Sequence, residues 1–308
     1  MSPERTRQLS TAVKVLGLLL LGALVAQRLD PRSVAGAFHG TSAQVAAAVS
    51  LFMAAMVFRV AKWVVQARAT GFEFRLLTLV HGFLWGILLG VVTPMRLGEM
   101  YRFGALRKNG APLAGAELGL AAAALVLEKS YEVLTLTTLV AAGAMVALPV
   151  WWVGACLWGC VAIGAAFGLG NMPVPVLPGR LGDVLGTLKS ARAALSVPQR
   201  VYIVGCTLVA NLLNLVGAAF VYRMFGEIAW GDLLFGLPVV AFSSAIPITI
   251  SGMGLREMAS MQVFGRAGYP ESAAAVAATL VFLGTNILPA LVAFPLEPFL
   301  TKREKLPR

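Results

Sequence analysis

The stretch TPMRLGEM at residues 93–100 decides how this chain folds, because nearly the same peptide, SGMGLREM, returns at residues 251–258. The two peptides stand 158 positions apart, from Glu99 to Glu257, and each begins with a hydroxyl residue, Thr93 or Ser251. At this offset they share the pairs Met95/Met253, Leu97/Leu255, Glu99/Glu257 and Met100/Met258. The offset also pairs the downstream residues Gly110/Gly268 and Pro112/Pro270. We therefore predict that the chain contains a duplicated unit.

The composition around these peptides is that of a polytopic membrane protein. Of the 308 residues, 58% are hydrophobic and 13% are charged, and the mean hydropathy is +0.82, far above that of a soluble domain. Apolar runs of about 20 residues, enough for a helical span, recur along the chain. They lack the alternating pattern of a membrane β-barrel. The predicted fold class is an all-α polytopic membrane protein.

The net charge of +11 is concentrated in four basic clusters. They lie at the N-terminus, at residues 59–75, at residues 180–200 and at the C-terminus. In membrane proteins Lys and Arg are enriched in the cytoplasmic loops. We therefore expect all four clusters on the cytoplasmic side of the inner membrane, together with both termini. This reading makes nucleic acid an unexpected partner.

Eight complete crossings would place the cluster at 180–200 outside, so two apolar runs must turn back. We predict that the runs before Thr93 and Ser251 enter to mid-depth, break, and return as short helices that carry the repeated peptide. Two re-entrant helical hairpins then accompany about six full transmembrane helices, near residues 10–27, 42–66, 113–147, 150–170, 200–224 and 271–300. The alternative is a set of ordinary spans kinked at proline and glycine.

The predicted organisation is a single integral membrane domain over residues 1–308. The first repeat, 42–147, consists of a span, a re-entrant hairpin and a span. A connecting span and a basic amphipathic linker occupy 148–199, and the second repeat occupies 200–300. Because one span separates the two units, the second is inverted relative to the first, an arrangement found in many secondary transporters.

The broken points predict a binding site for an anion. A helix that starts at mid-membrane exposes backbone N–H groups, which Thr93 and Ser251 are suited to cap, and Pro94 fits the first helical position. The two helix N-termini would point at the protein centre with their partial positive charges. Non-helical backbone at this depth also implies a cavity.

Charged residues lie inside the apolar runs, where one ion costs about 3 kcal/mol on insertion scales. We expect Glu128 and Glu132, which share a helix face, to pair with Arg96 and Arg256 and to leave a basic surplus for a phosphate. The alternative is that these ion pairs only lock the hairpins in place. The complete set of candidate binding residues is Thr93, Arg96, Glu99, Arg102, Glu128, Lys129, Glu132, Ser251, Arg256, Glu257 and Asn286.

Three ordered motifs resemble the flippase-like family that includes the membrane region of lysylphosphatidylglycerol synthase. They are P-x-R-x-G-E from Pro94, E-[KR]-x-x-[DE] from Glu128, and P-x-x-x-S-G-x-G-x-R-E from Pro247. Lys129 and Glu132 stand where the family pattern has Arg and Asp. The resemblance implies a protein that moves a lipid or lipid-linked molecule between the leaflets of the inner membrane.

The leading hypothesis is therefore a lipid translocator that binds an anionic headgroup in a central polar cavity. The expected partners are membrane lipids with a phosphate-bearing headgroup or a polyprenyl carrier; a homo-oligomer and a separate lipid-synthesising enzyme are left open. We expect no cofactor, metal or catalytic activity, and the chain has no nucleotide-binding motif. Two alternatives are a secondary transporter for a small soluble anion and an intramembrane lipid-modifying enzyme.

Overall fold

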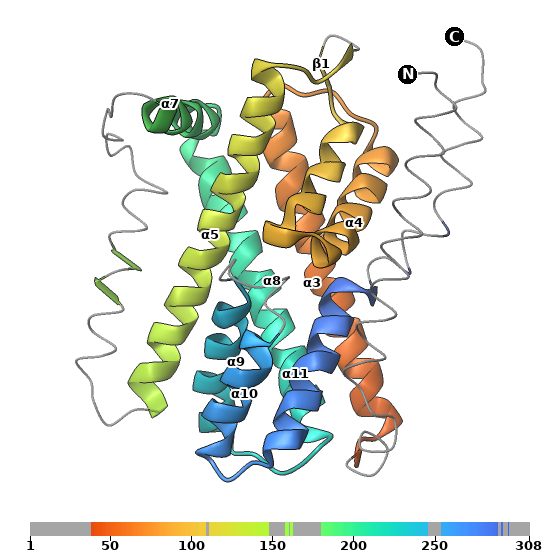
Figure 1. Ribbon diagram of the computed structural model, residues 1–308, viewed down its shortest axis with the longest axis vertical. Coiled ribbons are helices and arrows are strands. Elements are labelled where there is room, and N and C mark those ends of the chain that lie inside the picture. The colour runs from red at the N-terminus through yellow and green to blue at the C-terminus, as the bar shows by residue number, and fades with distance from the viewer. Residues whose placement is uncertain are drawn as a thin grey trace.

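The computed structural model describes residues 38–108, 111–147, 158–159, 161–162, 180–245, 254–288, 291 and 295. Most of the described residues are helical (Figure 1). The elements are α3 (Ser42–Ala69), α4 (Leu76–Val92), the 3₁₀ helix η1 (Pro94–Ala105), the strands β1 (Arg107–Lys108) and β2 (Ala111–Pro112), α5 (Ala116–Ala147), α7 (Arg180–Ala193), α8 (Val197–Arg223), α9 (Trp230–Ala245), α10 (Leu255–Gly265) and α11 (Glu271–Asn286).

Three long helices, α3, α5 and α8, form the frame of the molecule (Figure 1). Among the described residues, α3 and α8 are the helices both long and apolar enough to cross a membrane. Helix α5 has 32 residues, about 48 Å at 1.5 Å per residue, but carries charged residues at its centre. Large apolar side chains on these helices face outward, among them Val57 of α3 and Val146 of α5. Such outward apolar surface suits a lipid environment.

The local sequence explains where the two most apolar long helices begin. The side-chain oxygen of Thr41 accepts from the backbone N–H of Gln44, whose side chain in turn accepts from the N–H of Thr41. Ser196 and Gln199 form the same reciprocal pair before α8. This capping box satisfies backbone donors that would otherwise lack a partner at the start of a helix.

The predicted break at Thr93 is confirmed, and the chain folds back there. Helix α4 ends at Val92, Thr93 is extended with φ −106° and ψ 142°, and η1 returns along α4 from Pro94. Backbone contact is so close that a Cβ on Gly98 would lie 2.2 Å from the carbonyl carbon of Leu89. Gly86 and Gly90 of α4 face η1 in the same way, against Glu99. The returning segment is a 3₁₀ helix.

A second hairpin is formed by α9 and α10. The two helices are in close contact, because a Cβ on Gly236 of α9 would lie 2.4 Å from the Phe264 ring of α10. The chain then turns at Gly268, whose φ of +80° is the left-handed conformation that glycine adopts readily. The expected break at Ser251 lies outside the described residues.

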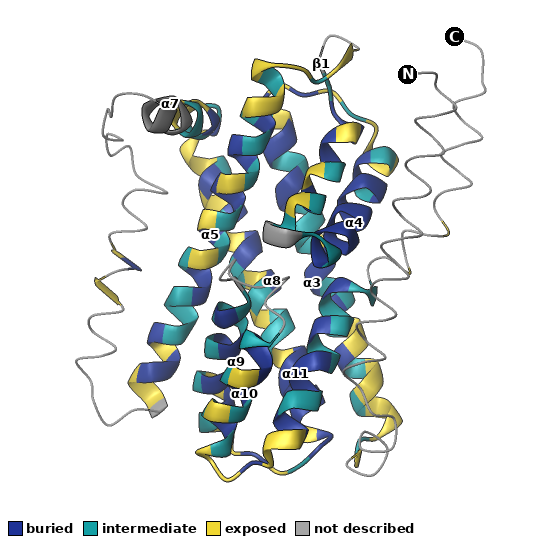
Figure 2. Cartoon of the chain, in the orientation of Figure 1, coloured by how far each residue is buried: buried dark blue, intermediate teal, exposed yellow. Residues whose placement is uncertain are grey.

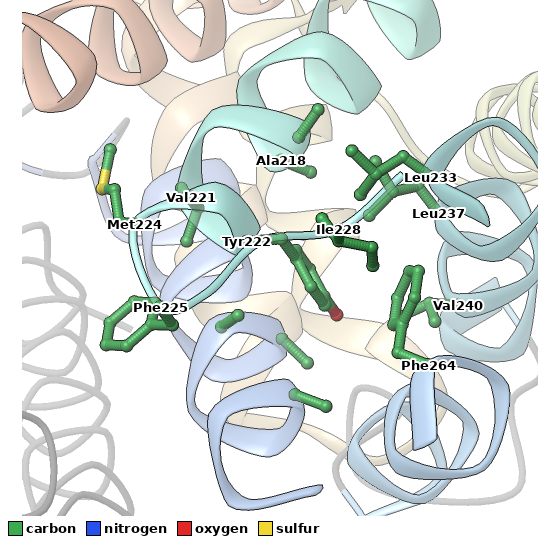
Figure 3. Close-up of a cluster of buried hydrophobic side chains, with 14 of the residues drawn as sticks. Ala218, Val221, Tyr222, Met224, Phe225, Ile228, Leu233, Leu237, Val240 and Phe264 are labelled. Atoms are coloured by element: carbon green, nitrogen blue, oxygen red, sulfur yellow. The ribbon is translucent and has the colours of Figure 1, made fainter. Parts of the chain in front are cut away.

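The same order of elements occurs twice, as α3–α4–η1–α5 and as α8–α9–α10–α11. The α4–η1 hairpin occupies the upper half of the view and the α9–α10 hairpin the lower half (Figure 1). Each hairpin has its own apolar core: one surrounds Trp63, Trp85 and Leu88, and the other surrounds Tyr222 and Phe264 (Figure 3). The hairpins therefore approach the middle of the molecule from opposite ends.

The described helices lie at positions where membrane spans were predicted. The helices α3, α5 and α8 correspond to the predicted spans 42–66, 113–147 and 200–224, and α11 is described to Asn286 of the predicted span 271–300. The predicted spans 10–27 and 150–170 lie outside the described residues, apart from short pieces of the second. Helix α7, in the third basic cluster, lies at the same end of the molecule as the end of α3 (Figure 1).

Candidate functional site

The centre of the site is the buried carboxylate of Glu128, halfway along α5. Its Oε1 lies 3.2 Å from Nζ of Lys62 on α3, and its Oε2 lies 2.9 Å from Nη1 of Arg102 on η1. Lys62 also donates to the hydroxyl of Thr207 on α8, at 3.4 Å. One carboxylate thereby ties α3, α5 and the first hairpin together, with α8 attached through Lys62.

Glu99 of η1 is a second centre of ion pairs. Its carboxylate lies 3.4 Å from Nη2 of Arg102, 3.6 Å from Nη1 of Arg96 and 3.0 Å from Nζ of Lys129. Lys129 also pairs with Glu132 at 3.2 Å, one turn further along α5. The candidate residues of the first hairpin and of α5 therefore form one continuous network.

The expected pairing of Glu128 and Glu132 with Arg96 and Arg256 is wrong. Glu128 pairs with Lys62 and Arg102, and Glu132 pairs with Lys129. The rotation of α5 turns Glu128 toward α3 and toward the middle of η1, beyond the hairpin tip where Arg96 lies.

Arg102 is held in place by aromatic rings as well as by carboxylates. Its guanidinium carbon lies 4.2 Å from the ring centre of Trp63 and 5.4 Å from that of Phe83. Arginine stacks favourably on aromatic faces, especially when both groups are shielded from water. Both Arg102 and Trp63 are buried, so this cation belongs to the structural part of the network.

Thr93 precedes the first residue of η1 as predicted, but its side chain does not cap the first turn of that helix. Its hydroxyl donates to the carbonyl of Leu89 at 2.9 Å and accepts from the backbone N–H of Gly98 at 2.7 Å. Arg96, inside the loop that Thr93 closes, has φ 58°. Left-handed backbone is uncommon for a residue other than glycine and is often retained at functional sites.

In the second hairpin, Arg256 has a carboxylate partner from the same helix. Arg256 pairs with its neighbour Glu257, and its guanidinium carbon lies 4.2 Å from the ring centre of Phe282. Oε2 of Glu257 accepts from the backbone N–H of Gly254 at 2.7 Å. The start of α10 is thus capped from within the helix. The cap predicted at Ser251 lies outside the described residues.

The two hairpins contribute Arg96 and Arg256 to the wall of one cavity of about 140 Å³. Nη2 of Arg96, from the first hairpin, donates to Oδ1 of Asn286 on α11 at 3.3 Å. Among the described residues, the charged ones in the cavity wall are Arg59, Lys62, Arg96, Glu132 and Arg256. Uncharged polar groups such as Asn211, Asn214 and Asn286 share the wall with apolar side chains such as Leu136, Leu215 and Val240. The cavity therefore has a cationic and amphipathic lining.

The candidate residues occupy three positions relative to this cavity. Arg96, Glu132, Arg256 and Asn286 line it. Glu99, Arg102, Glu128 and Lys129 lie behind it in the ion-pair network. Thr93 holds the turn of the first hairpin, and Glu257 flanks Arg256.

Two cavity residues, Arg59 and Lys62, were missed by sequence analysis. Both were assigned to a cytoplasmic cluster because they follow a long apolar run, yet they project from α3 into the cavity wall. Their spacing of three residues could have indicated this position, because it places both side chains on one face of the helix. Among the described residues, no group of His, Cys, Asp and Glu is arranged to hold a metal ion.

Comparison with known proteins gives one match. No curated protein and no solved structure matches the chain significantly. The family model described as the lysylphosphatidylglycerol synthase TM region matches residues 11–293, nearly the whole sequence. Together with the apolar helices, this match makes the protein a membrane protein from a lipid-related family. The chain belongs to the family of the lysylphosphatidylglycerol synthase transmembrane region.

Proposed function

We propose that the protein moves a lipid or lipid-linked molecule with an anionic headgroup between the leaflets of the cytoplasmic membrane. The observation that carries this proposal is the cationic cavity that both hairpins line, where the described charged residues are Arg59, Lys62, Arg96 and Arg256 against one carboxylate, that of Glu132. Ions this deep in a membrane protein mark substrate pathways when they face a cavity. The protein relocates the lipid in this proposal and leaves its covalent structure unchanged.

The proposed mechanism uses an inverted repeat. Three features support it. The element order occurs twice, and the hairpins enter from opposite ends (Figure 1). A third is that Arg96 and Gly254, each three residues before the repeated glutamate, both have positive φ, 58° and 85°. Rocking of one repeat against the other would open the cavity to each leaflet in turn. In this arrangement the hairpins are re-entrant and the two termini are cytoplasmic.

The exposure of part of the ion-pair network at the outer surface of the protein favours a lipid substrate over a small soluble anion. The side chains of Lys129 and Glu132, halfway along α5, are 30% and 23% exposed, and that of Arg96 on η1 is 28% exposed. Exposed apolar residues Val126 and Val133 flank Lys129 on α5. A headgroup could therefore reach the ion pairs from the side while its chains remain in hydrocarbon. The apolar portion of the cavity wall would accommodate the first part of those chains.

Transport of reducible fluorescent lipids in proteoliposomes tests the proposal. Arg96→Ala and Arg256→Ala should each slow movement of an anionic lipid by about tenfold or more, because a charge-assisted hydrogen bond to the headgroup is lost. Arg266→Ala is the matched control, since Arg266 is exposed just after α10. Equal rates for protein-free liposomes and all variants would contradict the proposal. Uptake of soluble phosphate without lipid movement, or recovery of chemically altered lipid, would favour the carrier or the enzyme instead.

A further inference from the structure

We propose that the headgroup bound in this cavity carries two negative charges, as a phosphate monoester or a diphosphate does, and that Arg59 is one of the residues that bind it. This proposal rests on the function proposed above and specifies its substrate class. It follows from three observations on the described residues: an excess of positive charge, a cavity arginine without a salt-bridge partner, and buried guanidinium donors without hydrogen-bond partners.

The first observation is the charge balance of the cavity and its supporting network. The cations are Arg59, Lys62, Arg96, Arg102, Lys129 and Arg256, and the carboxylates are Glu99, Glu128, Glu132 and Glu257. Six positive charges face four negative ones, which leaves two in excess. Uncompensated charge is costly in a low-dielectric interior. A ligand with two negative charges would neutralise the site.

The second observation locates part of the excess at Arg59. Lys62, one turn further along α3, is paired with Glu128, Arg96 with Glu99, and Arg256 with Glu257. Arg59 is half-buried and lines the same cavity. Glu132 in the same wall interacts with it electrostatically, but no described carboxylate forms a salt bridge with Arg59. Its guanidinium is therefore available to a bound anion.

The third observation is that two arginines of the wall have unused hydrogen-bond donors. The Nε atoms of Arg96 and Arg256 are buried, and neither has a hydrogen-bond partner in the described part of the chain. Arg256 as a residue is only 4% exposed, so its unpaired donor is poorly placed to reach bulk water. Buried donors are normally satisfied, and guanidinium groups match the oxygens of a phosphate.

These donors distinguish between classes of headgroup. A terminal phosphate offers three acceptor oxygens and up to two charges to Arg59, Arg96 and Arg256. A phosphodiester offers two free oxygens and one charge, so it leaves one cation uncompensated. A headgroup with an added ammonium would place another positive charge among them, and we expect such lipids to bind weakest.

Binding to the full-length protein in phosphatidylcholine nanodiscs tests this inference at pH 8. The probes are phosphatidic acid, a short-chain polyprenyl diphosphate, phosphatidylglycerol, and inorganic phosphate and pyrophosphate in solution. We expect Kd values for the first two lipids about tenfold or more below that for phosphatidylglycerol, the effect of one further charge-assisted contact. Arg59→Gln should reduce this preference to about twofold. Arg59→Lys, which keeps the charge, should retain more of it.

Arg68→Gln is the matched control, because Arg68 lies on the same helix, near its end, and does not line the cavity. It should leave the preference unchanged. Equal affinity for all three lipids, or a preference that survives in Arg59→Gln, would overturn the inference. Lipid transport without a preference for doubly charged headgroups would refute only this inference. Tight binding of phosphatidic acid or pyrophosphate without any lipid movement would support it and refute the proposed transport.

Discussion

Glu128 shows how a single residue stabilises the middle of this protein. Its two oxygens face Lys62 and Arg102, which come from different elements, and all three side chains are buried. A buried ion pair contributes little net stability relative to apolar packing, but removal of one partner leaves the other charge uncompensated. Loss of the Glu128 carboxylate should therefore destabilise the folded protein, because two buried cations would lose their counter-ion.

We predict that Glu128→Gln lowers the free energy of unfolding by about 3–5 kcal/mol, because Lys62 and Arg102 then remain buried without that carboxylate. The measurement is unfolding of the purified protein in detergent micelles. Glu117→Gln on the same helix is the control, since Glu117 is only partly buried and forms no ion pair with a described residue. Equal stability of the two variants would show that Glu128 is not an essential counter-ion.

At the scale of elements, the first hairpin depends on backbone contact between α4 and η1. Gly82, Gly86 and Gly90 recur every four residues and so form one face of α4. Each of them lies against η1, and Gly98 of η1 lies against α4 in return. This contact places Arg96 and Glu99 at their positions, because any side chain between the two segments would separate them.

Gly98→Ala should therefore disrupt the hairpin. The new Cβ would lie 2.2 Å from the carbonyl carbon of Leu89, which is backbone and cannot rotate away. We expect a loss of about 1–3 kcal/mol or more, the usual cost of overpacking, together with loss of lipid transport. Gly104→Ala provides a control within the same η1 segment, where a Cβ meets nothing within 4 Å. A Gly98→Ala protein as stable and active as this control would refute the packing argument.

At the scale of the whole molecule, the distribution of basic residues sets the orientation. Arg68 at the end of α3 and exposed Lys189 of α7 belong to elements that meet one end of the molecule, and the α10–α11 turn with Arg266 lies at the other (Figures 1 and 2). Basic residues are retained on the cytoplasmic side during insertion. The upper end in the figures is therefore the proposed cytoplasmic end.

Labelling with a membrane-impermeant thiol reagent tests this orientation in cells. Single cysteines are introduced at Arg68, Lys189 and Arg266 in a background without the native cysteines 156, 160 and 206. We expect Arg266→Cys to react in intact spheroplasts. Arg68→Cys and Lys189→Cys should react only after the membrane is permeabilised. Reaction of Lys189→Cys from outside would show that the orientation is reversed.

The sequence by itself determined the helical membrane class, the break at Thr93 and the family. These features depend on composition and on local backbone preferences, which neighbouring residues specify directly. It also supplied most of the charged residues of the site. Only the tertiary structure decided that Glu128 pairs with Lys62 and Arg102, and that Arg59 faces the cavity. Ion pairing depends on the rotation and axial offset of packed helices, which no single segment encodes.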